Sequence, residues 1–316
     1  MKAAQMNAYG GPEVIQVNDV AKPEVKPGQV LVEVNAASIN PFDFKLRLGY
    51  MKDMIPLKFP FTVGGDVAGK VTQVGDGVDG FKVGDRVYGQ AAGVAGNSGA
   101  FAEFAATSAG QLAQAPKGLS WEEMASLPLA GVSAWQAMVE HLQLKRGQTV
   151  LIHGGAGGIG SLAVQLAQHL GAKVTATAGA GNLDYVKGLG ADEVVDYQSQ
   201  DVAGLRDFDA AFDTVGGDEF NKVLRTVKRG GTVVSMGGYS LDKALAAELG
   251  VTAIAQGTKV TTAALDKLRE LVESGAVKPQ VGKMFPLAQT RAAFEALENG
   301  SVRGKVVIEV LAKNVD

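Results

Sequence analysis

The segment from Thr149 to Gly179 constrains the fold more than any other part of the chain. Thr149 to Ile152 is short, apolar and rich in branched side chains, which predicts a buried parallel strand. Apolar residues then recur with a period of about 3.6 between residues 162 and 170, as on one face of a helix. Gly171 ends that helix, and a second strand begins at Lys173. The order strand, turn, helix, strand predicts a βαβ unit.

The turn inside this unit has glycines at the spacing that dinucleotide-binding loops use. Gly155, Gly157 and Gly160 allow a tight turn, a close approach of the backbone to a pyrophosphate, and close packing of helix on strand. The N–H groups at the start of the helix would then face the phosphates. We expect dinucleotide contacts from the whole loop: Gly155, Ala156, Gly157, Gly158, Ile159 and Gly160.

Length and composition exclude several other classes of protein. The 316 residues suffice for two domains, and 46% of them are hydrophobic. A net charge of −3 offers no basic field for nucleic acid or an acidic membrane. The absence of cysteine excludes disulfides and thiolate zinc sites, and it fits a reducing compartment. With no signal-peptide pattern at the first residues and no long apolar run, we expect a cytoplasmic protein without a membrane span.

Residues 1 to 122 are expected to be rich in strands. Val30–Val34 alternates apolar and polar residues, and the run from Val63 to Gly89 alternates valines with polar residues and turn glycines. Such short strands with tight connections predict a small barrel. Helical features begin only near residue 120, where Ser120 and Glu123 have the spacing of a capping box.

Residues 123 to 258 alternate strands and helices, which predicts a doubly wound parallel sheet. We expect a helix over 124–142, broken at Pro128 and Gly131, and another over 220–227. Ligands of such sheets lie at the carboxyl ends of the strands. The candidate contacts at these ends are Thr177, Val215, Met236, Gly237 and Gly238. Residues 259 to 316 are expected to return to the first domain with two amphipathic helices and a closing strand.

Several short motifs occur in the order that one known family has. They are Asn35–Asp43, Gly69–Gly89, Ala130–Trp135, Gly154–Gly160, Leu189–Tyr197, Phe212–Gly217 and the Gly304-Lys-Val-Val run. Over nearly its whole length the chain resembles the zinc-free quinone oxidoreductase (zeta-crystallin-like) branch of the medium-chain dehydrogenase/reductase superfamily. The resemblance implies an α/β protein with a GroES-like β-barrel catalytic domain, residues 1–122 and 259–316, and a Rossmann domain, residues 123–258.

The resemblance also locates the zinc positions of the zinc-dependent relatives. Those relatives have a cysteine ligand where this chain has Asn40 and a histidine ligand where it has Gly65. Neither residue is a good zinc ligand, and we expect no metal. The histidine nearest the glycine turn, His153, is expected to be a strand-end residue satisfied by backbone groups.

Without zinc, another group must stabilise negative charge on a substrate. Asn40 can donate a hydrogen bond to a substrate oxygen, or it can simply cap the turn before Pro41. Tyr50 matches a family tyrosine near the substrate, with a surface aromatic as the alternative. We expect Asp43 to hold local structure rather than to catalyse, and water or a weak acid to supply the proton.

The expected cofactor is NADPH. NAD-binding relatives have an acidic residue at the end of the second strand, where this chain has Thr177 or Ala178, so room remains for a 2′-phosphate. By resemblance, Asn182 and Tyr197 would touch that phosphate and Ser133 the nicotinamide, although Ser133 could instead bond its own helix backbone.

The predicted activity is reduction of quinones or α,β-unsaturated carbonyls by hydride transfer. One alternative is an enoyl-thioester reductase of the same superfamily, and another is a dinucleotide-binding sensor or structural protein with little catalysis. The apolar edge strand Val251–Ala255 carries no protecting charge, which predicts a homodimer.

Overall fold

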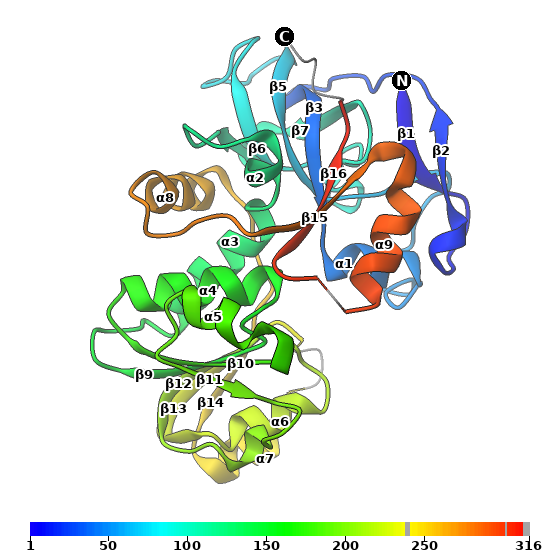
Figure 1. The fold of residues 1–316 in the computed structure, drawn as a ribbon. Coiled ribbons are helices and arrows are strands. Elements are labelled where there is room, and N and C mark those ends of the chain that lie inside the picture. Colours follow the sequence, from blue (N-terminus) through cyan, green and yellow to red (C-terminus); the bar gives the residue numbers. More distant parts are fainter. Residues whose placement is uncertain (238–240, 301, 312–316) are drawn as a thin grey trace. The chain divides into compact units, whose positions relative to one another are not determined.

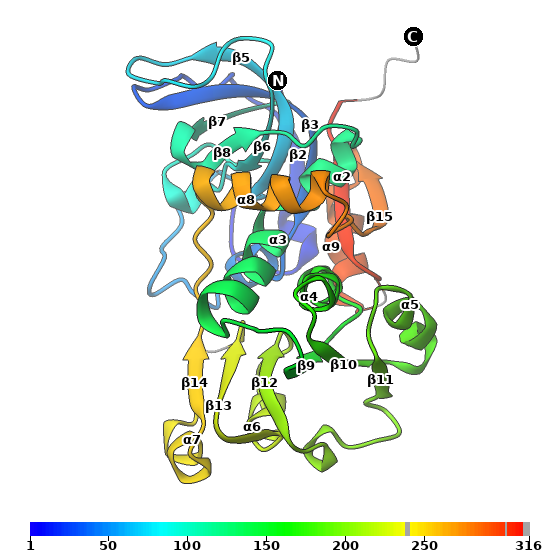
Figure 2. The same cartoon turned by 90° about the vertical axis from the view of Figure 1, so that its left-hand side faces the viewer.

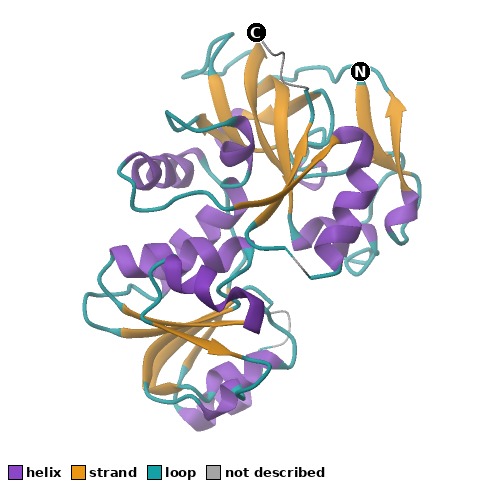
Figure 3. Ribbon diagram, viewed as in Figure 1, coloured by secondary structure: helices purple, strands orange, loops and turns teal. Residues whose placement is uncertain are grey.

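The computed structural model describes residues 1–237, 241–300 and 302–311. The chain forms two compact units. The first consists of residues 1–129, 260–273 and 279–316, and the second of residues 130–259 and 274–278. Strands dominate the first unit, whereas strands and helices alternate in the second (Figure 3).

The first unit contains two sheets. A three-stranded antiparallel sheet has the order β2-β1-β4, and a seven-stranded sheet has the order β15-β16-β3-β5-β6-β8, with β7 also paired to β3. The small sheet comprises β1 (Lys2–Met6), β2 (Ile15–Asp19) and β4 (Phe61–Thr62). The large one comprises β3 (Gln29–Ile39), β5 (Asp66–Val74), β6 (Arg86–Gln90), β7 (Phe104–Ser108), β8 (Leu112–Gln114), β15 (Val281–Pro286) and β16 (Lys305–Glu309). Buried side chains from both sheets share one apolar core.

Short helices complete the first unit (Figure 1). They are α1 (Pro41–Arg47), α2 (Trp121–Ala125), α8 (Thr262–Glu273) and α9 (Thr290–Glu298). The predicted capping box begins α2, because Glu123 N donates to Ser120 Oγ while Ser120 N donates to the Glu123 carboxylate. Helix α1 begins directly where β3 ends, so residues on either side of this junction lie at one end of the large sheet.

The second unit is a six-stranded, entirely parallel sheet with the order β11-β10-β9-β12-β13-β14. The strands are β9 (Thr149–His153), β10 (Lys173–Ala178), β11 (Glu193–Asp196), β12 (Phe208–Asp213), β13 (Val227–Ser235) and β14 (Thr252–Ala255). Helices α4 (Gly158–His169) and α5 (Leu183–Gly188) cover one face, and α6 (Glu219–Leu224) and α7 (Lys243–Leu249) cover the other (Figure 1). The predicted doubly wound sheet is confirmed, and its strands run side by side in Figure 2.

Two helical expectations were wrong in detail. The segment expected as one interrupted helix over 124–142 is α2, then α3 (Pro128–Trp135), then a π-helical stretch over Gln136–His141. The expected helix over 220–227 ends at Leu224, and β13 already begins at Val227. The helix ends early because Val227 pairs with Phe208 of β12, and the Val227 side chain lies in the apolar core beside this sheet. Within the described residues, no helix is long and apolar enough to cross a membrane.

Candidate functional site

The three glycines of the turn after β9 differ in whether the packing of the chain requires a glycine at that position. A Cβ on Gly160 would lie 2.1 Å from the carbonyl oxygen of Gly154, so only glycine lets helix and turn pack there. A Cβ on Gly155 would lie 3.0 Å from Ala176 Cβ, a tight fit against β10. A Cβ on Gly157 would meet nothing closer than 3.5 Å. The chain's own packing therefore does not require Gly157, and the open space beside it suits a group from outside the chain.

Gly157 is also the residue that caps α4. Its backbone is extended, and the helix begins at Gly158. The first N–H groups of a helix have no partner within the helix, and they carry the positive end of its dipole. The open space beside Gly157 thus lies at a site that favours a phosphate group. The residues of this turn fit the pyrophosphate of a dinucleotide, as the sequence predicts.

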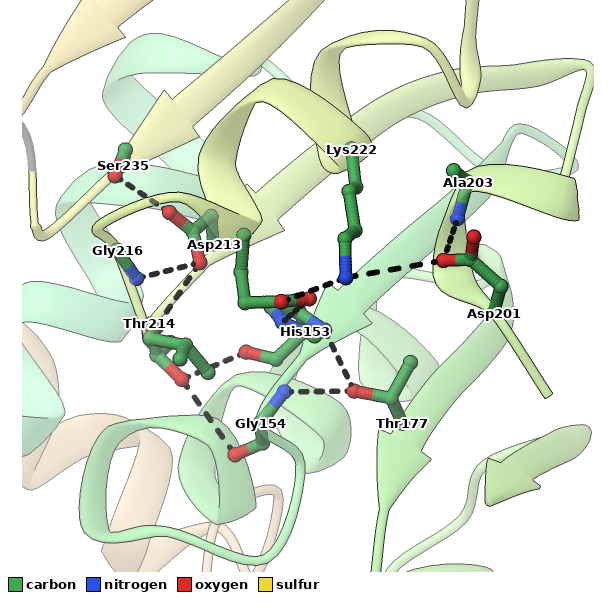
Figure 4. A network of polar contacts seen from close by, with 12 residues as sticks. His153, Gly154, Thr177, Asp201, Ala203, Asp213, Thr214, Gly216, Lys222 and Ser235 are labelled. Atoms are coloured by element: carbon green, nitrogen blue, oxygen red, sulfur yellow. Dashed lines mark hydrogen bonds and ion pairs between the residues drawn. The ribbon is translucent and has the colours of Figure 1, made fainter. Parts of the chain in front are cut away.

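A hydrogen-bond network joins the turn to the ends of β9, β10 and β12 (Figure 4). Gly154 N donates to Thr177 Oγ1 over 3.0 Å, and the same hydroxyl lies 2.8 Å from His153 Nδ1. Thr214 Oγ1 donates to the carbonyl oxygen of His153 over 2.7 Å. The Thr177 hydroxyl therefore joins the backbone of the turn to the His153 ring.

His153 differs from its expectation, because a threonine hydroxyl rather than the backbone satisfies its Nδ1. Within the described chain, its Nε2 has no hydrogen-bond partner and lies 4.0 Å from Glu219 Oε2. Burial lowers the pKa of His153, although Asp213 and Glu219 act in the opposite direction. A neutral imidazole therefore holds Thr177, and Thr177 holds the turn.

Asp213 organises the next two strand ends. One carboxylate oxygen accepts from the N–H groups of Val215 and Gly216, each over 3.0 Å, and the other accepts from Ser235 Oγ over 2.7 Å (Figure 4). Ser235 Oγ in turn accepts from Gly237 N. These bonds fix the loops after β12 and β13 beside the glycine turn, at the carboxyl edge of the sheet.

The structure thus brings most of the predicted cofactor contacts to one edge. Thr177 lies next to the last residue of β10, and the glycine turn, Val215, Met236 and Gly237 follow the carboxyl ends of the neighbouring strands β9, β12 and β13. A Cβ on Gly216 would lie 2.5 Å from Gly237 Cα, so the two loops touch through bare backbone. Gly238 lies outside the described residues.

Three further residues were predicted to contact the cofactor, and each has a different environment. Tyr197 is exposed, and a Cβ on Gly179 would lie 3.6 Å from its hydroxyl, which places the phenol beside the end of β10. Asn182 ends a short 3₁₀ turn that follows β10. Ser133 is buried, and its Oγ lies 2.7 Å from Thr258 Oγ1, a side-chain partner that the sequence did not suggest.

The first unit contains a second polar site, where β3 passes into α1. Asn40 is 4% exposed, and its Nδ2 donates to Asp66 Oδ2 over 2.8 Å. Its Oδ1 accepts from Lys305 Nζ, which also donates to the carbonyl oxygen of Ile39 over 2.8 Å. The amide of Asn40 is therefore held between a cation and a carboxylate, and within the described residues its second N–H has no hydrogen-bond partner.

Strand pairing assembles this cluster. Strand β3 has β5 on one side and β16 on the other, with Ser38 aligned to Asp66 and Ile39 aligned to Val306. Asp66 and Lys305 consequently flank the end of β3 although they are far apart in the sequence. Burial lowers the pKa of Lys305, while the carboxyl groups of Asp66 and Asp43 act to raise it.

Tyr50 does not belong to the buried cluster. It is 72% exposed on the segment after α1. Asp66 and Lys305 were not predicted as functional residues. The sequence contains one signal for Lys305, because a lysine begins the otherwise apolar run Lys-Val-Val-Ile of a buried strand.

Comparison with known proteins identifies the family. The model of the alcohol dehydrogenase GroES-like domain matches residues 26–117, and that of zinc-binding dehydrogenase matches residues 189–308. The chain is 39% identical over 320 residues to the 2-methylene-furan-3-one reductase of Solanum lycopersicum, covering 98% of this chain and 79% of that protein. The chain belongs to the medium-chain dehydrogenase/reductase superfamily.

Two further relatives indicate the branch of this superfamily to which the chain belongs. The chain is 37% identical to the chloroplastic NADPH-dependent alkenal/one oxidoreductase of Arabidopsis thaliana, with 98% of this chain and 79% of that one covered. It superimposes on the quinone oxidoreductase of Coxiella burnetii with a TM-score of 0.92 at 34% identity, covering 98% and 99% of the two chains. The predicted zinc-free quinone oxidoreductase branch is confirmed.

The name of one family model mentions zinc, but the residues at the zinc positions of this chain do not fit that metal. The two zinc-ligand positions of the superfamily hold Asn40 and Gly65, and Asn40 offers its oxygen to the Lys305 ammonium group. Asp66 Oδ2 lies 3.5 Å from the same ammonium. Zinc prefers thiolate, imidazole and carboxylate ligands, and a neighbouring ammonium repels a metal cation. We derive no catalytic step through zinc.

Proposed function

We propose that the protein is an NADPH-dependent oxidoreductase that reduces quinones or α,β-unsaturated carbonyl compounds. The observation that carries the proposal is the open space beside Gly157 at the start of α4, next to three further strand ends held by Asp213 and Thr177. This edge fits a dinucleotide, and relatives named alkenal/one oxidoreductase and quinone oxidoreductase supply the reaction class.

The chain's own residues have defined tasks in this proposal. NADPH, when bound, supplies a hydride. The α4 N-terminus holds the pyrophosphate, and the bare backbone of the loops after β12 and β13 lies against the rest of the cofactor. Asn40 donates its remaining N–H to the substrate oxygen on which negative charge develops, because Lys305 and Asp66 hold its amide in one orientation.

The test is NADPH consumption with a series of enones and quinones. We expect turnover with at least one member of each series. Turnover with enoyl thioesters alone would favour the thioester reductase of the same superfamily. Absence of turnover with every acceptor, in a protein that binds NADPH, would favour a sensor or structural role and contradict the proposal.

The role of Asn40 has its own test. Removing one oxyanion donor costs about a hundredfold in rate, so Asn40→Ala should lower turnover about a hundredfold and change NADPH affinity much less. A change in turnover below about threefold would return Asn40 to a capping role, with its backbone N–H bonded to Asp43.

We further propose a preference for NADPH over NADH. Strand β10 ends with Thr177 and Ala178, where NAD-binding relatives have an acidic residue, and the Tyr197 hydroxyl lies beside Gly179. Lys187 is not assigned to the phosphate, since its Nζ already donates to the carbonyl oxygen of Asp192. One hydrogen bond to a phosphate contributes about 1.5–3 kcal/mol, or roughly ten- to a hundredfold. The ratio of kcat/KM for NADPH and NADH, measured with the wild type and with Tyr197→Phe, tests this preference. Equal values for the two cofactors in the wild type would contradict it.

A homodimer in the cytoplasm completes the proposal. Strand β14 ends the six-stranded sheet and pairs only with β13 within the described chain, which leaves its other edge for a second copy. Light scattering at micromolar concentration tests the dimer, and a monomer would contradict it. The cytoplasmic location rests on the absence of cysteine, and cell fractionation tests it.

A further inference from the structure

Two carboxyl groups of the first unit lie in one buried cluster but have opposite surroundings. Asp66 accepts hydrogen bonds from Ser38 Oγ, Asn40 Nδ2, Gln90 Nε2 and the Leu129 N–H, over 2.8 to 3.2 Å, and faces the Lys305 ammonium at 3.5 Å. Such a set of donors suits a carboxylate anion.

The Asp43 carboxyl group has far fewer hydrogen-bond donors around it. Within the described chain, one backbone N–H, that of Asn40, donates to its Oδ2 over 2.7 Å, and its Oδ1 accepts no hydrogen bond. Asp43 is 8% exposed. Burial raises the pKa of Asp43 to about 7, and the charge of Asp66 on β5 adds to this, while the Asn40 N–H and Lys305 on β16 oppose it. Asp43 is therefore a carboxylic acid that still holds its proton near neutral pH.

An open position adjoins the unused oxygen of Asp43. A Cβ on Gly65 would lie 4.0 Å from Asp43 Oδ1, 3.8 Å from Gln90 Nε2 and 3.7 Å from Ala92 Cβ, which are ordinary contacts. Neither the backbone conformation nor the packing requires glycine at residue 65. The absence of a side chain there leaves room for a heavy atom of another molecule, bordered by an acid and an amide donor.

We propose that Asp43 is the acid that protonates the substrate oxygen in the reaction proposed above. A buried carboxyl group that keeps its proton beside an open position is a pattern typical of acid–base sites. The inference rests on the proposed reductase function and goes beyond it by naming the proton donor.

The step balances as follows for an enone. Hydride from NADPH forms the new C–H bond at the β-carbon, and the C=C electron pair shifts so that the carbonyl oxygen becomes negative. An O–H bond then forms between this oxygen and the proton of Asp43, which leaves an Asp43 carboxylate. A proton from water restores the acid, and the enol converts to the saturated ketone in solution. The sum is enone, NADPH and one proton giving ketone and NADP⁺.

The test compares the wild type with Asp43→Asn. Asparagine keeps an oxygen that accepts from the Asn40 N–H, but it has no acidic proton. Loss of a general acid costs about 10²–10⁴-fold in rate, so turnover with an enone should fall at least about a hundredfold. The dissociation constant for NADPH should change less than about threefold, because Asp43 is in the first unit and the glycine turn in the second.

The pH profile distinguishes an acid from a structural residue. Wild-type kcat should fall as the pH rises through about 7, because Asp43 then loses the proton that it must donate. The residual activity of Asp43→Asn should lack this fall. Stability gives a readout without turnover: since the folded state holds this proton more tightly than the unfolded state, the wild-type melting temperature should decrease from about pH 6 to about pH 8 more than that of the variant.

Asp85→Asn is the matched control. Asp85 also accepts from the backbone N–H three residues before it, that of Lys82 over 3.0 Å, and it lies in the same unit outside the cluster. Its variant should keep wild-type turnover and the wild-type pH profile.

Gly65→Ala provides a second test that does not depend on how Asp43→Asn folds. The new methyl group would make only ordinary contacts, so the chain should fold, but it would occupy the position beside Asp43 Oδ1. We expect turnover to fall at least about tenfold, as when a substrate is displaced from its catalytic group.

The outcomes separate this inference from the proposed function. Absence of turnover by the wild type overturns both. Turnover by the wild type, together with a wild-type rate and pH profile in Asp43→Asn or a wild-type rate in Gly65→Ala, overturns only the role of Asp43.

Discussion

Replacing Gly157 by valine should abolish cofactor binding while leaving the fold almost intact. The backbone of Gly157 has φ −77° and ψ 176°, a conformation that any residue adopts. A Cβ there meets only the Gly154 carbonyl oxygen, at 3.5 Å. The folded chain itself therefore has room for the first atom of a side chain, and the substitution should act mainly on a bound phosphate.

The substitution should change the melting temperature little and the affinity for NADPH strongly. Valine is a poorer helix cap than glycine by about 1 kcal/mol, which lowers the melting temperature by about 2–4 °C. A side chain beside the α4 N-terminus would displace the pyrophosphate from about two N–H donors. Charge-assisted hydrogen bonds contribute about 1.5–3 kcal/mol each, so the affinity for NADPH should fall by about 10²–10⁴-fold.

The assay is calorimetric titration with NADPH beside a thermal melt. Gly110→Val is the matched control, because a Cβ there also makes a single ordinary contact, with Ser108 Oγ at 3.8 Å, but Gly110 belongs to a 3₁₀ turn of the first unit. NADPH binding by Gly157→Val within about threefold of the wild type would refute the assignment of the turn as phosphate site. An unfolded Gly157→Val chain would instead show that packing, and not a ligand, requires this glycine.

Three further outcomes are expected. Gly160→Ala should lower the free energy of unfolding by about 1–3 kcal/mol in a denaturant titration, because its Cβ would lie 2.1 Å from the Gly154 carbonyl oxygen; an unchanged midpoint would contradict this. Lys305→Met should destabilise the chain by about 3–5 kcal/mol in the same titration, since it leaves Asp66 buried without its cation, and a neutral effect would mean that the cation is dispensable. Dialysis against a strong chelator should leave turnover unchanged, because Lys305 occupies the oxygen of Asn40; activity lost with stoichiometric zinc and regained on its return would refute the zinc-free assignment.

Features set by a few neighbouring residues could be predicted from the sequence. The glycine spacing after Thr149–Ile152 predicted the strand, the turn and the start of the helix, because residues close in the chain determine a turn and a helix cap. The same holds for the capping box of Ser120 and Glu123. The alternation of strands and helices was enough to predict the parallel sheet, since a parallel pair needs a crossover connection.

Local patterns were less reliable where tertiary pairing competed with helix periodicity. The expected helix over 220–227 lost its last residues to β13, because Val227 gains a buried position beside Phe208 by pairing with β12. The segment 124–142 is interrupted before Pro128 as expected, but the expected break at Gly131 is wrong, because α3 continues through this residue.

The chemistry of the first unit was decided by the tertiary structure alone. Asn40 and Asp43 could be recognised as polar residues near a turn, but their partners are remote in the chain. Lys305 reaches Asn40 only because β16 pairs with the end of β3, and Asp66 arrives through β5 on the other side. Hydrogen bonding and burial act over a few ångströms in space, so the different surroundings of the Asp43 and Asp66 carboxyl groups arise only after these strands have paired.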